Sequence, residues 1–276
     1  MDGAIEYFRS VAKTERKQTD KVDADGFIVC GVCGERRQQE ISVPETIHPS
    51  GKYRVPVPCR CMREREEQIK KKQEADERER QAQKLLLWSG LKNPRTFAED
   101  NKENRQASAI CRKYVIHFDK MSANNIGLLL YGDVGTGKTF FAECITHALC
   151  ARLKRVCFLR TSDMLSDINA VSDMLSKVSA CDLLVIDDFG TQRDSKYAWE
   201  VMHSVFDQRT KVKKPTIITT NLSPDTMAQE TDIDKRRIYD RIKEMCPVEI
   251  KFTGQSQRQT NAADKREAAI RILKGE

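Results

Sequence analysis

Residues 132–139 read Gly-Asp-Val-Gly-Thr-Gly-Lys-Thr, and this stretch decides the fold of the chain. It fits the pattern G-x-x-x-x-G-K-[ST], whose glycines let backbone N–H groups curl around phosphate oxygens at the start of a helix. The apolar run 126–131 precedes it as a strand, and residues 140–153 follow it as a helix, which is the context that the pattern requires. We therefore expect a nucleotide-binding loop made of Gly132, Asp133, Val134, Gly135, Thr136, Gly137, Lys138 and Thr139.

Two side chains of this loop have expected roles toward ATP or GTP. Lys138 is expected to reach the β- and γ-phosphates, and Thr139 to offer its hydroxyl to Mg²⁺. Such an ion prefers hard oxygen ligands beside the phosphates. The apolar run 183–186 supplies them, because it ends in Asp187 and Asp188. Asp187 is predicted to hold Mg²⁺ through water, and Asp188 to polarise the attacking water as a general base.

Further strands and helices alternate along the chain. The runs 155–160, 183–186 and 216–220 read as strands, and residues 162–179 and 197–209 read as helices between them. Such alternation predicts a parallel sheet with helices on both faces, a three-layer αβα core. The strand 216–220 ends in Asn221, whose amide is expected to orient water near the γ-phosphate.

A cationic stretch, residues 235–243, follows the last of these strands. Arg237 and Arg241 are four residues apart there, so they share one face of a helix. An arginine that reaches the γ-phosphate held by a neighbouring subunit accelerates hydrolysis by stabilising transition-state charge. The alternative interpretation is a solvated basic helix face.

In their order and intervals these motifs resemble those of the AAA+ ATPases of the DnaC/DnaI type, the replicative helicase loaders, and of the related IstB transposition helpers. The resemblance covers about residues 90–260 and rests on the phosphate loop and on three segments, Leu-Val-Ile-Asp-Asp-Phe-Gly (184–190), Lys-Pro-Thr-Ile-Ile-Thr-Thr-Asn-Leu-Ser (214–223) and Arg-Ile-Tyr-Asp-Arg-Ile (237–242). It implies that Asn221 is the sensor 1 residue, Arg241 the arginine finger and Arg237 a supporting arginine. Arg258 stands where such proteins carry a sensor 2 arginine.

Two features depart from that family's pattern. Little sequence follows the last motif to form the usual C-terminal helical lid. The second acid is Asp188 rather than the commoner glutamate, so slow hydrolysis is expected.

A cluster of cysteines precedes the ATPase motifs. Cys30 and Cys33 form a C-x₂-C pair, and Cys59 and Cys61 form a C-x-C pair. Four thiolates in two close pairs predict a tetrahedral zinc site, with His48 as an alternative to one cysteine. The other six cysteines (111, 144, 150, 157, 181 and 246) lie in apolar segments and are expected to be buried.

The composition divides the chain into three parts. Residues 1–61 are predicted to form the zinc-binding module, residues 62–88 a charged helical linker, and residues 89–276 the AAA+ ATPase domain. The net charge of +7 permits contact with nucleic acid without requiring it. No segment is apolar enough for a membrane span, and the chain does not begin with a secretory signal pattern, so a cytoplasmic location in a bacterium or a phage-infected cell is expected.

The resemblance implies an ATPase that delivers a replicative hexameric helicase onto single-stranded DNA, with ATP, Mg²⁺ and Zn²⁺ as cofactors and self-association through the trans arginine. It also implies that the zinc module docks on the helicase. Basic residues predicted to follow a phosphate backbone are Arg160, Lys177, Lys211, Lys213 and Lys214. The alternatives are an IstB-like transposition helper, an adaptor that binds nucleotide without hydrolysing it, and a small-molecule kinase, which the arginine pair disfavours.

Overall fold

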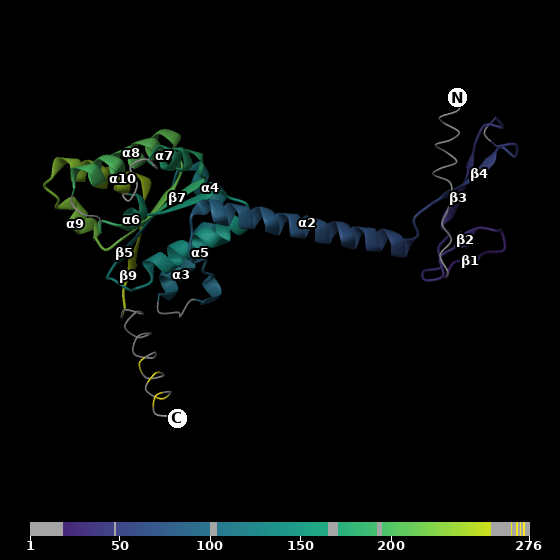
Figure 1. The fold of residues 1–276 in the computed structure, drawn as a ribbon, viewed down its shortest axis with the longest axis horizontal. Coiled ribbons are helices and arrows are strands. Elements are labelled where there is room, and N and C mark those ends of the chain that lie inside the picture. Colours follow the sequence, from purple (N-terminus) through teal and green to yellow (C-terminus); the bar gives the residue numbers. More distant parts are fainter. Residues whose placement is uncertain are drawn as a thin grey trace. The chain divides into compact units, whose positions relative to one another are not determined.

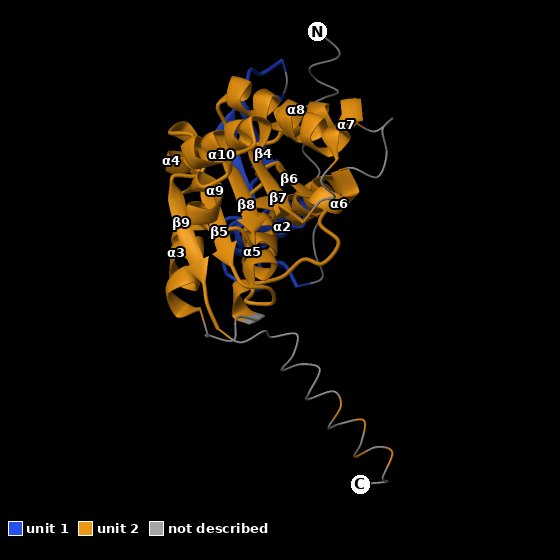
Figure 2. Ribbon diagram, turned by 90° about the vertical axis from the view of Figure 1, so that its left-hand side faces the viewer, with its two compact units in different colours: residues 1–77 blue, residues 78–276 orange. Residues whose placement is uncertain are grey.

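The computed structural model describes residues 19–46, 48–99, 104–164, 171–191 and 195–254, together with residues 266, 269, 271 and 273. The chain divides into two compact units, Met1–Glu77 and Arg78–Glu276 (Figure 2). Within the described residues, no helix is both long enough and apolar enough to cross a membrane.

The first unit contains two short antiparallel hairpins that sequence reasoning did not predict. Strand β1 (Lys21–Val22) pairs with β2 (Ile28–Val29), and β3 (Gln38–Ser42) pairs with β4 (Lys52–Pro56). An ion pair between the buried side chains of Asp20 and Arg37 lies in this unit. A module of this size buries little apolar surface, so polar contacts carry more of its stability than in a large domain.

Helix α2 (Arg60–Ser89) is the charged helix that the composition predicts, and Ser89 is its one buried residue. Ion pairs at helical spacing, such as Glu67 to Lys71 at 2.6 Å, stabilise such a solvated helix by about 0.2–0.5 kcal/mol each. Near its end, Leu85 and Leu86 pack against the core of the second unit.

The second unit, which holds the helices labelled α3 to α10 in Figure 1, is built on a parallel sheet of five strands in the order β6-β7-β8-β5-β9 (Figure 2). The strands are β5 (Leu128–Gly132), β6 (Val156–Arg160), β7 (Leu183–Phe189), β8 (Thr216–Thr220) and β9 (Val248–Phe252). The helices are η1 (Phe97–Glu99), α3 (Arg105–Ile116), α4 (Phe118–Ala123), α5 (Lys138–Ala151), α6 (Thr161–Met164), α7 (Val171–Ala180), α8 (Lys196–Val212), α9 (Pro224–Ala228) and α10 (Ile233–Met245).

Side chains alternate between the two faces of this sheet and form two apolar cores. Leu128 and Leu130 pack with residues of α3 and α5 on one face. Leu129 packs with residues of α7, α8 and α10 on the other. Successive side chains of β5 therefore pack against helices on opposite faces of the sheet. The predicted three-layer αβα fold is confirmed.

Two local details differ from the sequence-based expectations. The segment before the phosphate loop, for which the sequence analysis names no helix, forms α3 and α4, which meet at His117. Strand β9 was not predicted, because it is an edge strand whose Glu249 and Lys251 are exposed while Ile250 and Phe252 are buried. A short segment with two charged residues carries a weak strand signal.

Arg209 links two connections at the end of the sheet where the strands begin. It is fully buried, and its guanidinium donates to the carbonyl oxygens of Val178, Cys181, Asp182 and Pro215 at 2.6–3.2 Å. These carbonyls belong to the last turn of α7, to the connection that follows it and to the residue before β8, so a single side chain ties both connections together.

Candidate nucleotide site and cysteine cluster

The phosphate-binding loop follows β5 directly and depends on its glycines. Gly132, Gly135 and Gly137 have φ angles of 135°, 83° and 103°, in the region that L side chains rarely adopt. A Cβ atom on Gly132 would lie 2.1 Å from the carbonyl oxygen of Phe252 in β9. The glycines therefore allow the sharp turn and the close approach of β9.

Lys138 begins α5 and lies against the loop. It is 5% exposed, and its Nζ donates to the carbonyl oxygens of Gly132 at 2.8 Å and Asp133 at 2.6 Å. From the segment before α3, Asn104 Nδ2 donates to the carbonyl of Thr136 at 3.0 Å. The helix N-terminus and the ammonium group thus face the same loop, as binding of an anionic phosphate requires.

Asp187 lies beside this loop at the end of β7. Its Oδ1 accepts hydrogen bonds from Thr139 Oγ1 at 2.9 Å and Thr219 Oγ1 at 2.6 Å. Its Oδ2 is buried and accepts no hydrogen bond from any described residue, although Arg160 Nε lies 3.8 Å away. Burial raises the pKa of Asp187, while the hydroxyls of Thr219 and Thr139 oppose that rise.

This donor set fits a hydrated Mg²⁺ ion. A buried carboxylate oxygen without a hydrogen-bond donor lowers the stability of the fold unless a ligand or a water molecule binds to it. The hydroxyl of Thr139 and the carboxylate of Asp187 are the hard oxygen donors that Mg²⁺ prefers. Sequence reasoning placed both residues at one site, and the structure brings them into contact.

Asp188 differs from its neighbour in exposure because β7 is irregular there. The register between β7 and β8 shifts between Ile186 and Phe189, and Asp188 has a φ of 57°. Its backbone N–H donates to Thr219 Oγ1 at 2.9 Å, while its side chain is exposed. The bulge therefore turns this carboxylate out to solvent at the edge of the sheet where the phosphate loop lies.

The predicted polar residues that follow β7 in the sequence differ in solvent exposure and in their ion pairs. Asn221 follows β8 and is exposed. Arg237 in α10 is exposed and lies 3.6 Å from Asp234. Arg241 is half-buried and forms an ion pair with Asp207 of α8. Arg258 lies outside the described residues.

Sequence reasoning missed the part that three residues, Thr219, Arg160 and Glu143, play at this site. Thr219 bridges Asp187 and Asp188, and it occurs in the Thr-Thr-Asn run that had already been singled out for Asn221. Arg160 ends β6 opposite Asp187 and forms a 3.4 Å ion pair with the buried Glu143 of α5. Burial raises the pKa of Glu143. Only the strand order, which places β6 beside β7, could have revealed that Arg160 belongs here.

The other basic residues predicted to follow a phosphate backbone lie in the last turn of α7, at the end of α8 or just before β8. Lys177 is in the last turn of α7, and Lys211 is in the last turn of α8. Lys214 donates to the carbonyl of Cys181 at 3.1 Å. Lys177 and Lys211 lie at the C-terminal ends of helices, where lysine also stabilises the negative end of the helix dipole.

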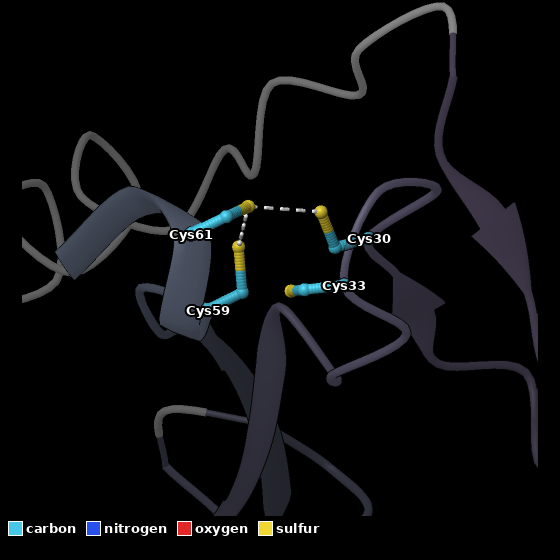
Figure 3. Close-up of side chains that lie close together, drawn as sticks. All are labelled: Cys30, Cys33, Cys59 and Cys61. Carbon is cyan, nitrogen blue, oxygen red and sulfur yellow. Dashed lines mark hydrogen bonds between the residues drawn. The ribbon is translucent and has the colours of Figure 1, made fainter. Parts of the chain in front are cut away.

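The four predicted cysteines of the first unit converge, as Figure 3 shows. Their sulfur atoms all lie within 4.8 Å of one another, with Cys61 Sγ 3.4 Å from both Cys30 Sγ and Cys59 Sγ. In a tetrahedral zinc site with Zn–S bonds of about 2.3 Å, the sulfur atoms stand about 3.8 Å apart. The cluster fits a zinc ion in donor type, number and spacing.

Backbone amides also prepare this cluster for a metal. The pKa of Cys30 is lowered to about 6, chiefly by the backbone N–H groups of Cys33 and Val32. The pKa of Cys61 is raised to about 12 by the thiols of Cys59 and Cys30. His48 lies outside the cluster, and its Nδ1 is 2.7 Å from Ser50 Oγ.

Comparison with known proteins gives a family match and several relatives. The model of the family "IstB-like ATP binding protein" matches residues 61–265. The replicative helicase loader DnaC of Escherichia coli K12 is 30% identical over 155 residues, which are 53% of this chain and 61% of that protein. The putative ATP-binding protein Rv3427c in an insertion sequence of Mycobacterium tuberculosis H37Rv is 29% identical over 103 residues, 35% of this chain and 41% of that protein.

The crystal structure of DnaI superposes with a TM-score of 0.51 at 20% identity and covers 63% of this chain and 92% of that one, which shows a shared fold. The chain spans about three fifths of the length of the DnaC proteins from Escherichia coli that it matches.

Proposed function

Because the chain belongs to the family of IstB-like ATP binding proteins, we propose that it is an ATP-hydrolysing helicase loader for DNA replication. In this proposal it delivers a replicative hexameric helicase onto single-stranded DNA. The observation that carries the proposal is the presence in one chain of the loop–Asp187 site and the four-cysteine cluster. The similarity to DnaC supports it in addition.

Each residue of the nucleotide site has a role in this proposal. The loop 132–137 cradles the phosphates, and Lys138 exchanges its loop carbonyls for the β- and γ-phosphates. Thr139 and Asp187 would hold Mg²⁺, which would neutralise charge on the phosphates when bound. Asp188, exposed at the bulge of β7, accepts the proton of the attacking water, and Asn221 orients that water.

Completion of the site needs a second copy of the chain. In the proposed assembly Arg241 leaves Asp207 and reaches the γ-phosphate held by a neighbouring subunit, and Arg237 supports it. The support for this step is the position of both arginines on α10, which also carries Ile238 and Ile242 into the core beside β8. The trans contact makes turnover depend on protein concentration.

The first unit is proposed to dock on the helicase. Four cysteines at zinc spacing support a rigid metal-bound module despite its small core. Its boundaries are proposed as residues 1–61, followed by the linker 62–88 and the ATPase domain 89–276. Residues 1–18 lie outside the described part of the chain.

Helicase loading on single-stranded DNA tests this proposal. The full chain is mixed with a replicative helicase and a circular single strand, and helicase transfer and ATP turnover are measured together. We expect turnover to rise with DNA and to disappear in Lys138→Ala and Asp187→Ala. Deletion of residues 1–61 is expected to abolish helicase binding. Retained helicase binding by the deletion variant would assign docking to another surface, and intact ATP binding without turnover would favour a nucleotide-switched adaptor.

A transposition helper is the second candidate. The family description and the similarity to the insertion-sequence protein of Mycobacterium tuberculosis favour it. It predicts binding to duplex DNA and to a transposase, with no effect on helicase transfer. The same loading experiment, run beside a duplex-DNA binding assay, distinguishes the two functions.

A further inference from the structure

Arg160 stands between two buried carboxylates. Its Nη2 lies 3.4 Å from Glu143 Oε1 and forms a hydrogen bond, while its Nε lies 3.8 Å from Asp187 Oδ2. The side chains of Glu143 and Asp187 are 8% and 1% exposed. The guanidinium of Arg160 therefore lies near two buried carboxylates, and its closer contact is with Glu143.

The neighbouring strand and the next residue fix the backbone of Arg160 beside Asp187. Arg160 is the last residue of β6 and lies in register with Asp187 in β7. The next residue, Thr161, donates its hydroxyl to the backbone carbonyl of Asp187 at 3.0 Å, which fixes the backbone at this point. A rotation of the guanidinium can therefore bring it closer to Asp187 without any movement of the strands.

Such a rotation would affect Oδ2 of Asp187, the buried oxygen that accepts no hydrogen bond from any described residue. Thr139 and Thr219 already occupy Oδ1 of Asp187, so Oδ2 is the oxygen left for a metal-bound water. A guanidinium that closed on Oδ2 would compete with Mg²⁺ for the same lone pairs, because both are cations. The ion pair with Glu143 opposes this competition.

We propose that Glu143 is a positioning residue, which holds Arg160 back from Oδ2 of Asp187 and so leaves that oxygen available to the hydrated Mg²⁺ of the nucleotide site. This inference rests on the proposed Mg²⁺–ATP site, but on neither hydrolysis nor helicase loading. It assigns a role to a buried acid that lies outside the phosphate loop motif.

Equilibrium binding of a fluorescent ATP analogue, N-methylanthraniloyl-ATP, tests the proposal without turnover. Affinity for the analogue is measured over a series of free Mg²⁺ concentrations and in EDTA, with folding checked by circular dichroism. In Glu143→Gln the half-saturating Mg²⁺ concentration is expected to rise about tenfold, as for other residues that orient a metal ligand. In Arg160→Gln it is expected to fall, by about threefold, because the competing cation is gone.

Competition between Arg160 and Mg²⁺ predicts a rise in the half-saturating Mg²⁺ concentration for Glu143→Gln and a fall for Arg160→Gln. A general loosening of the structure would instead raise it in both variants. The double variant is expected to return close to the value of Arg160→Gln alone. Asp119→Asn is the matched control, since it removes an exposed carboxylate that pairs with Lys154 away from the loop, and no change is expected.

A rise in both single variants, or no change in Glu143→Gln, overturns the proposal. If Glu143→Gln fails to fold, Arg160→Gln alone tests the proposal, because only competition predicts a lower half-saturating Mg²⁺ concentration in that variant. Failure of the unaltered protein to bind the analogue in Mg²⁺ would instead refute the nucleotide site itself.

Discussion

Replacement of Thr219 by valine tests how the site is held together. The Thr219 hydroxyl donates to Asp187 Oδ1 at 2.6 Å and accepts from the backbone N–H of Asp188 at 2.9 Å. The residue is fully buried, and valine has nearly the same shape. Thr219→Val therefore removes one hydrogen bond to a carboxylate and leaves one backbone N–H without its acceptor.

The expected cost follows from these two losses. A hydrogen bond to a charged group contributes about 1.5–3 kcal/mol, and a buried donor left unpaired costs about 1–3 kcal/mol. Because the two losses share one hydroxyl, they are not fully additive, and we expect the free energy of unfolding to fall by about 2–4 kcal/mol. With a urea m-value of about 2 kcal/mol/M, the midpoint shifts down by about 1–2 M.

The assay uses the tryptophans of the second unit. The two tryptophans of the chain, Trp88 and Trp199, both belong to this unit, so their fluorescence reports its unfolding. The Mg²⁺ dependence of ATP-analogue binding is measured in parallel. It is expected to weaken about tenfold, since Asp187 loses one of the two hydroxyls that orient it.

Thr146→Val is the matched control. Thr146 is equally buried, but its hydroxyl bonds the carbonyl of Ala142 within α5 and touches neither acid. Its loss is expected to change the free energy of unfolding by less than about 1 kcal/mol. If Thr219→Val matched this control in stability, or lost stability without any effect on Mg²⁺ dependence, the orienting role of Thr219 would be refuted.

Four further predictions follow from the same structure. Cys59→Ser, at a buried cluster position, is expected to reduce bound zinc from about one per chain, measured by elemental analysis, while the urea midpoint of the second unit stays unchanged. Arg209→Met is expected to lower the free energy of unfolding by about 3 kcal/mol or more, because buried carbonyls lose their donor. Lys138→Ala is expected to weaken ATP binding at least about tenfold by titration calorimetry, since a charged hydrogen-bond donor is lost. Asp207→Asn is expected to lower the protein concentration that gives half-maximal ATP turnover by up to about fivefold, because Arg241 is released from a partly exposed ion pair. A rise in that concentration would contradict the last prediction.

The sequence predicts those parts of the site whose signals are local. The phosphate loop is one continuous segment, and its glycines are required by positive φ angles that other residues adopt with strain. Asp187 follows the buried apolar run 183–186, so its position near the end of a central strand could be inferred. The cysteine pairs likewise have a spacing that predicts a metal cluster, and the structure brings all four together.

The contacts that sequence reasoning missed are those that depend on strand order. Arg160 appears as a basic residue at the end of a strand, which is equally compatible with a DNA contact. It lies beside Asp187 because β6 is the neighbour of β7 at one edge of the sheet. Glu143 is the one acidic residue of α5, and its partner lies on another element. No spacing along the chain encodes such a pair.

The arginines of α10 illustrate the same limit and sharpen the proposed mechanism. Four-residue spacing places Arg237 and Arg241 on one face, yet their side chains are 67% and 33% exposed. Arg241 differs because α10 packs on α8, which carries Asp207. In the proposed assembly, Arg241 exchanges its ion pair with Asp207 for one with the γ-phosphate of a neighbouring subunit. Arg237 gives up only a 3.6 Å contact with Asp234. The net gain from Arg241 in the ground state is therefore small, and its contribution is concentrated in the transition state, where charge on the transferred phosphoryl group is best matched by a guanidinium. Arg241→Ala should consequently reduce turnover far more than it reduces self-association.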